Sequence, residues 1–315
     1  MAKAVATRQT YGETLCEIAE QFPDLVVLDA DLAAATKTEI FKKAYPDRFF
    51  DCGIAEGNMM GVAAGLASCG KIPFASSFAM FAAGRAFEQV RNIIGYPHLN
   101  VKIGATHAGC TVGEDGATHQ CNEDIALMRT IPGMVIINPS DAVEARAAVI
   151  AAAEHVGPVY LRFGRANAPI VNDNENYKFE IGKGVLMADG TDATIVASGL
   201  TLHIALEAAE LLSAEGISAR VINIHTIKPI DRDIIVKAAR ETGAIVTVEE
   251  HSIIGGLGSA VCEVVGEECP AVVVRVGMND QYGRSASAAQ LLEYYGFTKE
   301  NIAQKVKEAI AKKQK

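Results

Sequence analysis

Short apolar runs alternate with longer amphipathic stretches along nearly all of this chain of 315 residues. The apolar runs have the length of strands, from LVVL at 25–28 to VVVRV at 272–276, and the stretches between them have the length of helices. This alternation predicts parallel sheets covered by helices, because two parallel strands must be joined by a crossover, usually a helix. We therefore expect an α/β fold with mainly parallel sheets.

One polar segment, NAPIVNDNENYKFEIGKG at 167–184, interrupts this alternation. Its Asn, Asp, Pro and Gly content is typical of a linker. The length of the chain also suggests two domains, at roughly 150 residues for each domain. We therefore expect two three-layer α/β/α domains, at 1–170 and 189–315, joined by a linker at 171–188.

Three local patterns give more specific expectations. The stretch 80–94 is predicted to be one helix. Ser140 is a suitable N-cap for a helix over 141–154. Pro229 in HTIKPI is expected to set a turn at the end of a strand.

The charge and cysteine content exclude several classes of protein. The 29 Lys and Arg residues against 38 Asp and Glu residues give a net charge of −9, which is not the basic footprint of a nucleic-acid-binding protein. No run reaches 18 apolar residues, and the first residues do not form a secretory signal. The seven scattered cysteines contain no CxxC pair, so neither a disulfide framework nor a thiolate zinc site is expected. We expect a cytoplasmic protein that binds neither nucleic acid nor membrane.

Glu56 is the first candidate for chemistry, in the segment DCGIAEGNMMGVAAG. It lies among small apolar residues, where loss of solvation favours the neutral form of a carboxyl group. The competing interpretation is an acidic residue at a helix N-terminus, stabilised by the helix dipole. The spacing alone leaves both interpretations open.

The loop THAGCTVGEDGATHQ is the second candidate. It places His107, Glu114, Asp115 and His119 among three glycines, which allow tight turns and close approach to a ligand. Two imidazoles and two carboxylates can serve acid–base catalysis or hold a substrate. The alternatives are a metal site, although the spacing fits no standard zinc motif, and a polar surface loop.

The segment YLRFGRANAP is the third candidate, with Arg162 and Arg165 at the end of a predicted strand. Arginine binds anionic oxygens with two parallel hydrogen bonds. Ligands gather at the carboxyl ends of parallel strands. A pair of solvated surface arginines is the competing interpretation.

Together with SSFAMF, IPGMVIINPSD and VTVEEHSIIGGLGSAV, these segments occur in the order found in the C-terminal half of transketolase. The chain resembles that half over nearly its whole length, and GEDGATHQ is the most specific segment. The resemblance implies a pyrimidine-binding domain followed by a transketolase C-terminal domain. It also implies a thiamine diphosphate enzyme that transfers a two-carbon ketol unit from a ketose phosphate to an aldose phosphate.

The resemblance assigns four residues to the cofactor. Glu56 matches the catalytic glutamate that contacts the N1′ nitrogen of the aminopyrimidine, and Phe78 and Phe81 match the aromatic pocket around that ring. Asp31 matches an acidic loop near the cofactor. Gly84 stands where many transketolases have a third aromatic residue.

The resemblance assigns four residues to the substrate. His107 and Arg165 match groups that hold the sugar phosphate. Asp115 and His119 match groups that contact the hydroxyls of the donor or the acceptor. His107 and His119 are also the expected acid–base residues beside Glu56.

The GDG…N motif of the N-terminal half of transketolases, which binds diphosphate through Mg²⁺ or Ca²⁺, does not occur in this sequence. The chain is thus similar to the C-terminal subunit of a split transketolase. An N-terminal partner subunit would hold the metal, which leaves no metal ligands to this chain. A homodimer within an α2β2 assembly is expected.

Three alternatives stay open. Parts of the chain also resemble deoxyxylulose-phosphate synthase and the beta subunits of 2-oxo acid dehydrogenases. The pair His107 and His119, together with GEDG, favours transketolase over both. The third alternative is a non-catalytic scaffold subunit that has kept the fold.

Overall fold

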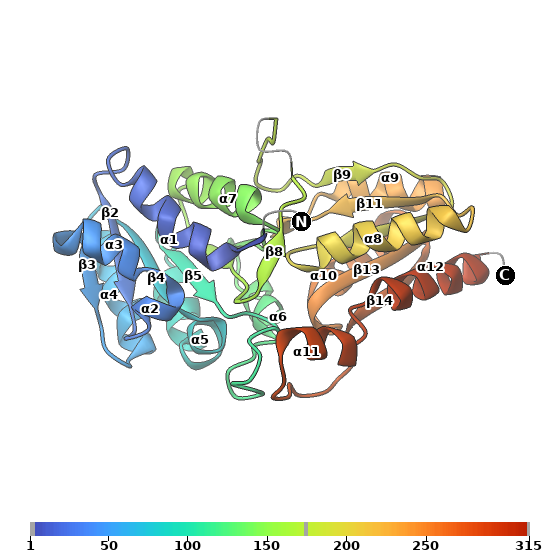
Figure 1. The fold of residues 1–315 in the computed structure, drawn as a ribbon. Coiled ribbons are helices and arrows are strands. Elements are labelled where there is room, and N and C mark those ends of the chain that lie inside the picture. Colours follow the sequence, from blue (N-terminus) through green and yellow to red (C-terminus); the bar gives the residue numbers. More distant parts are fainter. Residues whose placement is uncertain (1–3, 173–175, 314–315) are drawn as a thin grey trace.

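The computed structural model describes residues 4–172 and 176–313, which form two lobes side by side (Figure 1). The first lobe contains the strands β1 (Ala4–Ala6), β2 (Leu25–Asp29), β3 (Phe49–Asp51), β4 (Ile72–Phe78), β5 (Lys102–Thr106), β6 (Val135–Ile137), β7 (Val159–Arg162) and β8 (Asn167–Pro169). Its helices are α1 (Thr7–Ile18), α2 (Ala33–Thr36), α3 (Glu39–Ala44), α4 (Glu56–Ser68), α5 (Phe87–Gln89), α6 (Asp124–Arg129) and α7 (Ala142–Glu154), with the short helical segments η1 (Pro46–Arg48), η2 (Met80–Arg85) and η3 (Val90–Gly95).

The second lobe repeats the alternation of strands and helices. Its strands are β9 (Val185–Ala188), β10 (Ala193–Ala197), β11 (Ala219–Asn223), β12 (Thr226–Lys228), β13 (Ala244–Ser252) and β14 (Val272–Met278). Its helices are α8 (Thr201–Ala214), α9 (Arg232–Thr242), α10 (Leu257–Glu268), α11 (Ala288–Tyr294) and α12 (Lys299–Lys313). No described helix is long and apolar enough to span a membrane.

Within the described ranges, the large sheet of the first lobe has the order β12-β6-β7-β5-β4-β2-β3. All of its pairings are parallel except that of β12 with β6. The sheet is covered on both faces, so strands such as LVVLD of β2 are buried along their whole length. The second sheet, β14-β13-β10-β11-β9, is parallel except for β9. The predicted α/β class with mainly parallel sheets is confirmed.

Strand β12 joins the two lobes. It follows β11 in the sequence but pairs with β6 of the first sheet, where Thr226 lies opposite Ile137. The segment HTIKPI therefore contains an edge strand of the other lobe, which the sequence analysis did not predict. The expected turn is present, because β12 ends at Lys228 and the chain bends at Pro229. One apolar cluster continues from Met59 and Ile103 beneath the first sheet to Ile235 and Val261 beneath the second.

Two local expectations are wrong. The stretch 80–94 is not one α-helix, because η2 and η3 are π-helical segments separated by α5. The N-cap of α7 is Asp141, whose side chain accepts a hydrogen bond from the backbone of Glu144. Ser140 donates its hydroxyl to the carboxylate of Glu144 instead, so it stabilises the same turn by a different contact.

Candidate functional site

The carboxyl edge of the first sheet collects most of the candidate residues. Asp31 follows β2, Glu56 begins α4 after β3, and Phe78 ends β4. His107 follows β5, and Arg165 lies just beyond β7. Since β7, β5, β4, β2 and β3 are neighbours in this order and run in parallel, their ends lie along one edge. This is the place where open parallel sheets bind ligands.

A cluster of two phenylalanines and two histidines forms the centre of the site. The rings of Phe78 and His107 are stacked with centroids 3.8 Å apart, and Phe81 lies 5.9 Å from Phe78. The ring of His119 meets Phe81 edge-on at 5.4 Å. The structure therefore brings together four residues that the sequence predicted from two separate segments.

Glu56 is buried beside this cluster, with 2% of its side chain exposed. The Nη1 atom of Arg85 lies 2.9 Å from each of its carboxylate oxygens. The guanidinium of Arg85 also lies over the ring of Phe81, 4.6 Å from the centroid. Arg85 is absent from the residues predicted from sequence. Its spacing of four residues from Phe81 on a helical segment was the available signal, because this spacing places two side chains on one face.

The loop that carries His107 and His119 is held by the second lobe. The carboxylate of Glu250 in β13 accepts a hydrogen bond from the backbone N–H of Thr111 at 2.6 Å. Gly109 has a φ of +79°, and a Cβ there would lie 2.4 Å from the same carboxylate. The loop can therefore approach β13 only with glycine at this position.

Several cations surround His107. Burial lowers the pKa of His107 to about 3, and Arg8, Arg165, His119 and Lys37 add to this effect. Arg8 was not predicted from sequence, since its neighbours in the chain carry no chemical pattern. The pKa of Arg8 is lowered by burial and by Arg165, and its Nε atom has no hydrogen-bond partner among the described residues. Arginines near one another attract anions, because a negative charge reduces their mutual repulsion.

We expect the imidazole of His107 to stay neutral down to a pH of about 4, because its pKa is lowered to about 3. Removing one neighbouring positive charge in Arg165→Gln should raise this pKa, since the imidazolium is then repelled less. Histidine ring resonances measured by NMR against pH test both statements, with His107→Gln identifying the signal. A titration of His107 near pH 6.5 in the unsubstituted chain would contradict the arrangement described here.

Three predicted residues lie apart from the central cluster. Asp115 is exposed at the tip of its loop, and Asp31 is exposed and donates its backbone N–H to Asp51. Among the described contacts, none joins either residue to the phenylalanine cluster. Arg162 is not a ligand-binding surface residue, because it is buried and ion-paired with Asp124.

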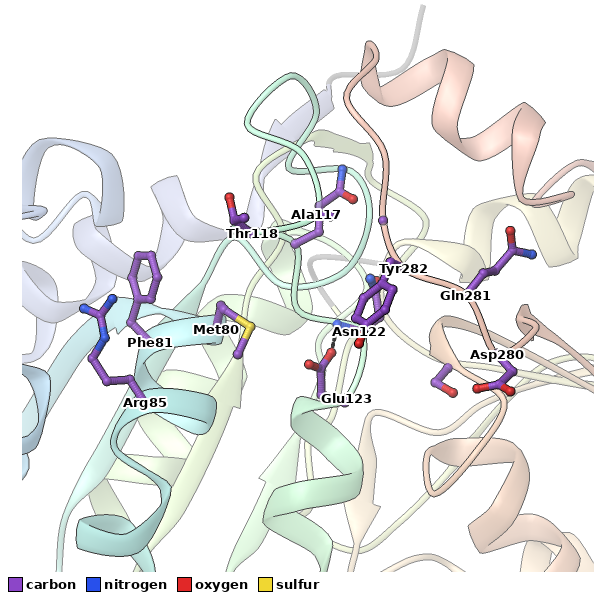
Figure 2. A pocket seen from close by; sticks show the side chains of 13 residues that line it. Met80, Phe81, Arg85, Ala117, Thr118, Asn122, Glu123, Asp280, Gln281 and Tyr282 are labelled. Carbon is purple, nitrogen blue, oxygen red and sulfur yellow. Dashed lines mark hydrogen bonds between the residues drawn. The ribbon is translucent and has the colours of Figure 1, made fainter.

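A pocket of about 760 Å³ opens between the two lobes next to this cluster (Figure 2). Met80, Phe81 and Arg85 lie on its first-lobe side, and Asp280 and Tyr282 lie on the opposite side. The Sδ–Cε end of Met80 fills the space above Gly84, where a Cβ would lie 2.2 Å from Met80 Cε. Met80 thus takes part of the room that a larger residue at 84 would need. In the described ranges, no group of three or more His, Cys, Asp or Glu residues could hold a metal ion.

Two family models match the chain. Residues 3–171 match the model described as "Transketolase, pyrimidine binding domain", and residues 182–302 match "Transketolase, C-terminal domain". A "Putative transketolase C-terminal section" of Methanocaldococcus jannaschii is 52% identical over 97% of this chain and 96% of the relative. A "6-deoxy-6-sulfo-D-fructose transketolase subunit" of Clostridium sp. is 44% identical over 97% of this chain and 95% of the relative. Human transketolase is 40% identical over 98% of this chain, which spans 49% of the human protein.

Solved structures give the same grouping. A structure titled "Split gene transketolase, inactive beta4 tetramer" is 54% identical and superposes with a TM-score of 0.90 over 98% of this chain and 99% of that one. Transketolase from Leishmania mexicana is 26% identical, with a TM-score of 0.84 over 100% of this chain and 47% of the other.

Proposed function

This chain belongs to the transketolase family as a C-terminal subunit, and we propose that it completes a thiamine diphosphate site together with an N-terminal partner subunit. The observation that carries the proposal is the buried carboxylate of Glu56 beside the stacked rings of Phe78 and Phe81. Two histidines adjoin the same rings, and the positive charges of Arg8, Arg165 and Lys37 act on one of them, His107.

Transketolases depend on thiamine diphosphate, and the described residues fit its aminopyrimidine ring. An aromatic heterocycle needs a stacking surface, which Phe78 and Phe81 offer, and a hydrogen-bonding partner, which Glu56 offers. When bound, this cofactor supplies the electron sink for breaking and forming carbon–carbon bonds. Asp31 lies at the same edge of the sheet and is proposed to border the cofactor.

Glu56 is proposed to hold a proton on its carboxyl group and to donate it in a hydrogen bond to the N1′ ring nitrogen. His107 is neutral at physiological pH, so an unprotonated nitrogen of its ring can accept a hydrogen bond from a substrate hydroxyl. His119, with its ring edge against Phe81, is proposed to orient a second hydroxyl. Asp115, at the tip of the loop, is proposed to reach the substrate as well.

Arg165 and Arg8 are proposed to bind the phosphate of the sugar, with His107 beside them. Positive charges near His107 lower its pKa. Among the described contacts, the one ion pair that these charges make is between Arg165 and Glu114, at 3.8 Å. A phosphate would satisfy them with charge-assisted hydrogen bonds. This arrangement supports sugar phosphates as the substrate class, with those of the pentose phosphate pathway as the first to test.

The partner subunit is proposed to hold the diphosphate through Mg²⁺ or Ca²⁺. We propose an α2β2 assembly with two copies of this chain, located in the cytoplasm. The match to one half of the human enzyme, and to nearly all of the subunit relatives, supports a division of the site between two chains.

The test is a calorimetric titration of thiamine diphosphate with Mg²⁺ into this chain, alone and mixed with candidate N-terminal subunits. An assay of xylulose 5-phosphate with ribose 5-phosphate follows. Tight binding and turnover in the mixture alone are expected. Turnover by the isolated chain would contradict the split site. Turnover of pyruvate in place of the ketose would instead favour a deoxyxylulose-phosphate-synthase-like enzyme, and binding with no turnover of any donor would favour a scaffold.

A further inference from the structure

The side chain of Arg85 contacts both a carboxylate and an aromatic ring of the proposed cofactor site. Its Nη1 atom is 2.9 Å from both oxygens of Glu56, and its planar guanidinium lies over Phe81. Glu56 is 2% exposed, whereas Arg85 is 53% exposed. A buried acid is thus neutralised by a group that reaches it from the surface.

The proposed function assigns the same two contacts to the aminopyrimidine ring of the cofactor. The guanidinium of Arg85 and the aminopyrimidine ring are both flat. Each can stack on Phe81 and place a nitrogen against Glu56. The guanidinium lies over the ring of Phe81 and against both carboxylate oxygens of Glu56. A cofactor ring that stacks on Phe81 and hydrogen-bonds to Glu56 would need the same place. Arg85 therefore has to move before the ring can bind there.

We propose that Arg85 is a placeholder that occupies the aminopyrimidine position in the cofactor-free chain and leaves it when the cofactor binds. This inference rests on the proposed function, because it takes the role of Glu56 from there. The placeholder compensates a buried carboxylate until the cofactor arrives, which avoids an unpaired charge beside the aromatic cluster.

The surroundings of Arg85 allow it to leave. Among the described residues, the side chain of Arg85 contacts Glu56 and Phe81, and both belong to the proposed cofactor site. The pocket between the lobes lies directly beside it, as Figure 2 shows. Glu123 and Asp280 line that pocket and offer carboxylates to a displaced guanidinium.

The test is the affinity of thiamine diphosphate for the complex of this chain with its N-terminal subunit, measured calorimetrically with Mg²⁺ for the unsubstituted chain and for Arg85→Ala. A half-exposed ion pair is worth up to about 1 kcal/mol, so removing the competitor should tighten binding by roughly 2- to 5-fold. Stopped-flow association of the cofactor should also become faster. The matched control is Arg232→Ala, which removes a surface arginine paired with Glu267 and Glu268 far from this site.

Two outcomes overturn the placeholder. Weaker binding in Arg85→Ala would mean that Arg85 supports Glu56 in the loaded site, and unchanged affinity and association rate would mean that Arg85 does not compete. Both results leave the proposed function intact, because the unsubstituted complex still binds. If the unsubstituted complex binds no thiamine diphosphate, the proposed function fails, and the placeholder fails with it.

Discussion

Glu56→Gln is expected to lower the kcat of the assembled enzyme by roughly 10²–10⁴-fold, the range found when a group that positions or transfers a proton is removed. Glutamine fills nearly the same volume and keeps hydrogen-bonding capacity. Its amide group does not take up or release a proton as a carboxyl group does. The loss of activity should therefore appear in kcat more than in KM. Steady-state kinetics of the complex with a ketose phosphate donor measure both parameters.

The control for this variant is Glu39→Gln. Glu39 is also the first residue of a helix, α3, but it is partly exposed and pairs with Lys43 one turn away. It represents the simple interpretation of Glu56 as an acid that stabilises a helix N-terminus. Unchanged activity in both variants would remove Glu56 from the chemistry and would revive a scaffold role for the chain.

Asp124→Asn is expected to destabilise the fold by roughly 3–5 kcal/mol, because it leaves the buried guanidinium of Arg162 without its counter-charge. The two side chains are 0% and 4% exposed, and they are joined by hydrogen bonds of 2.8 and 3.2 Å. The hydroxyl of Tyr160 also donates to Asp124, and Arg162 also donates to the backbone of Glu250 in the second lobe. The variant therefore weakens the contact between the lobes as well as the pair itself.

Urea unfolding at one fixed protein concentration measures this loss, since subunit association also contributes to stability. The control is Glu263→Gln, which breaks the more exposed pair with Arg129. Such a pair is worth about 1 kcal/mol or less. An equal effect of the two substitutions would show that burial does not set the value of the Asp124–Arg162 pair.

The buried parallel strands of the two large sheets could be predicted from the sequence. Buried parallel strands such as β2, with LVVL, and β6, with VII, contain uninterrupted apolar runs, and functional residues follow the carboxyl ends of the sheet's strands. Arg165 was found in this way, by local pattern and one general rule of sheet architecture. His107 was singled out by its glycine-rich loop, and Phe78 was assigned by the resemblance to transketolase.

Contacts between segments that are distant in the sequence could not be predicted from local pattern. Arg85 meets Glu56, and Arg8 comes near Arg165, only because of the order of strands in the sheet. Arg162 and Arg165 have the same local pattern, but one faces Asp124 in the interior and the other faces the loop of Glu114. No feature of a single segment distinguishes them.

Three local errors have a different cause. The periodicity of 80–94 does not separate α-helical from π-helical hydrogen bonding, because both place apolar residues on a similar face. Ser140 and Asp141 are both good N-caps, and helix ends are uncertain by a residue. The strand β12 is three residues long, and so short a strand is stabilised by its neighbours more than by its own sequence.

Because β12 follows the strands of the second lobe in the sequence but pairs with the sheet of the first, the two lobes cannot be engineered independently. A fragment that ended between the two matched family domains, after residue 171, would leave β6 as an open edge, where another chain could add a strand. A cut between these two family domains in the folded protein would leave the pieces joined through β12 and through the shared apolar cluster. A chimaera that replaces one domain with that of another transketolase has to exchange β6 and β12 as a matched pair.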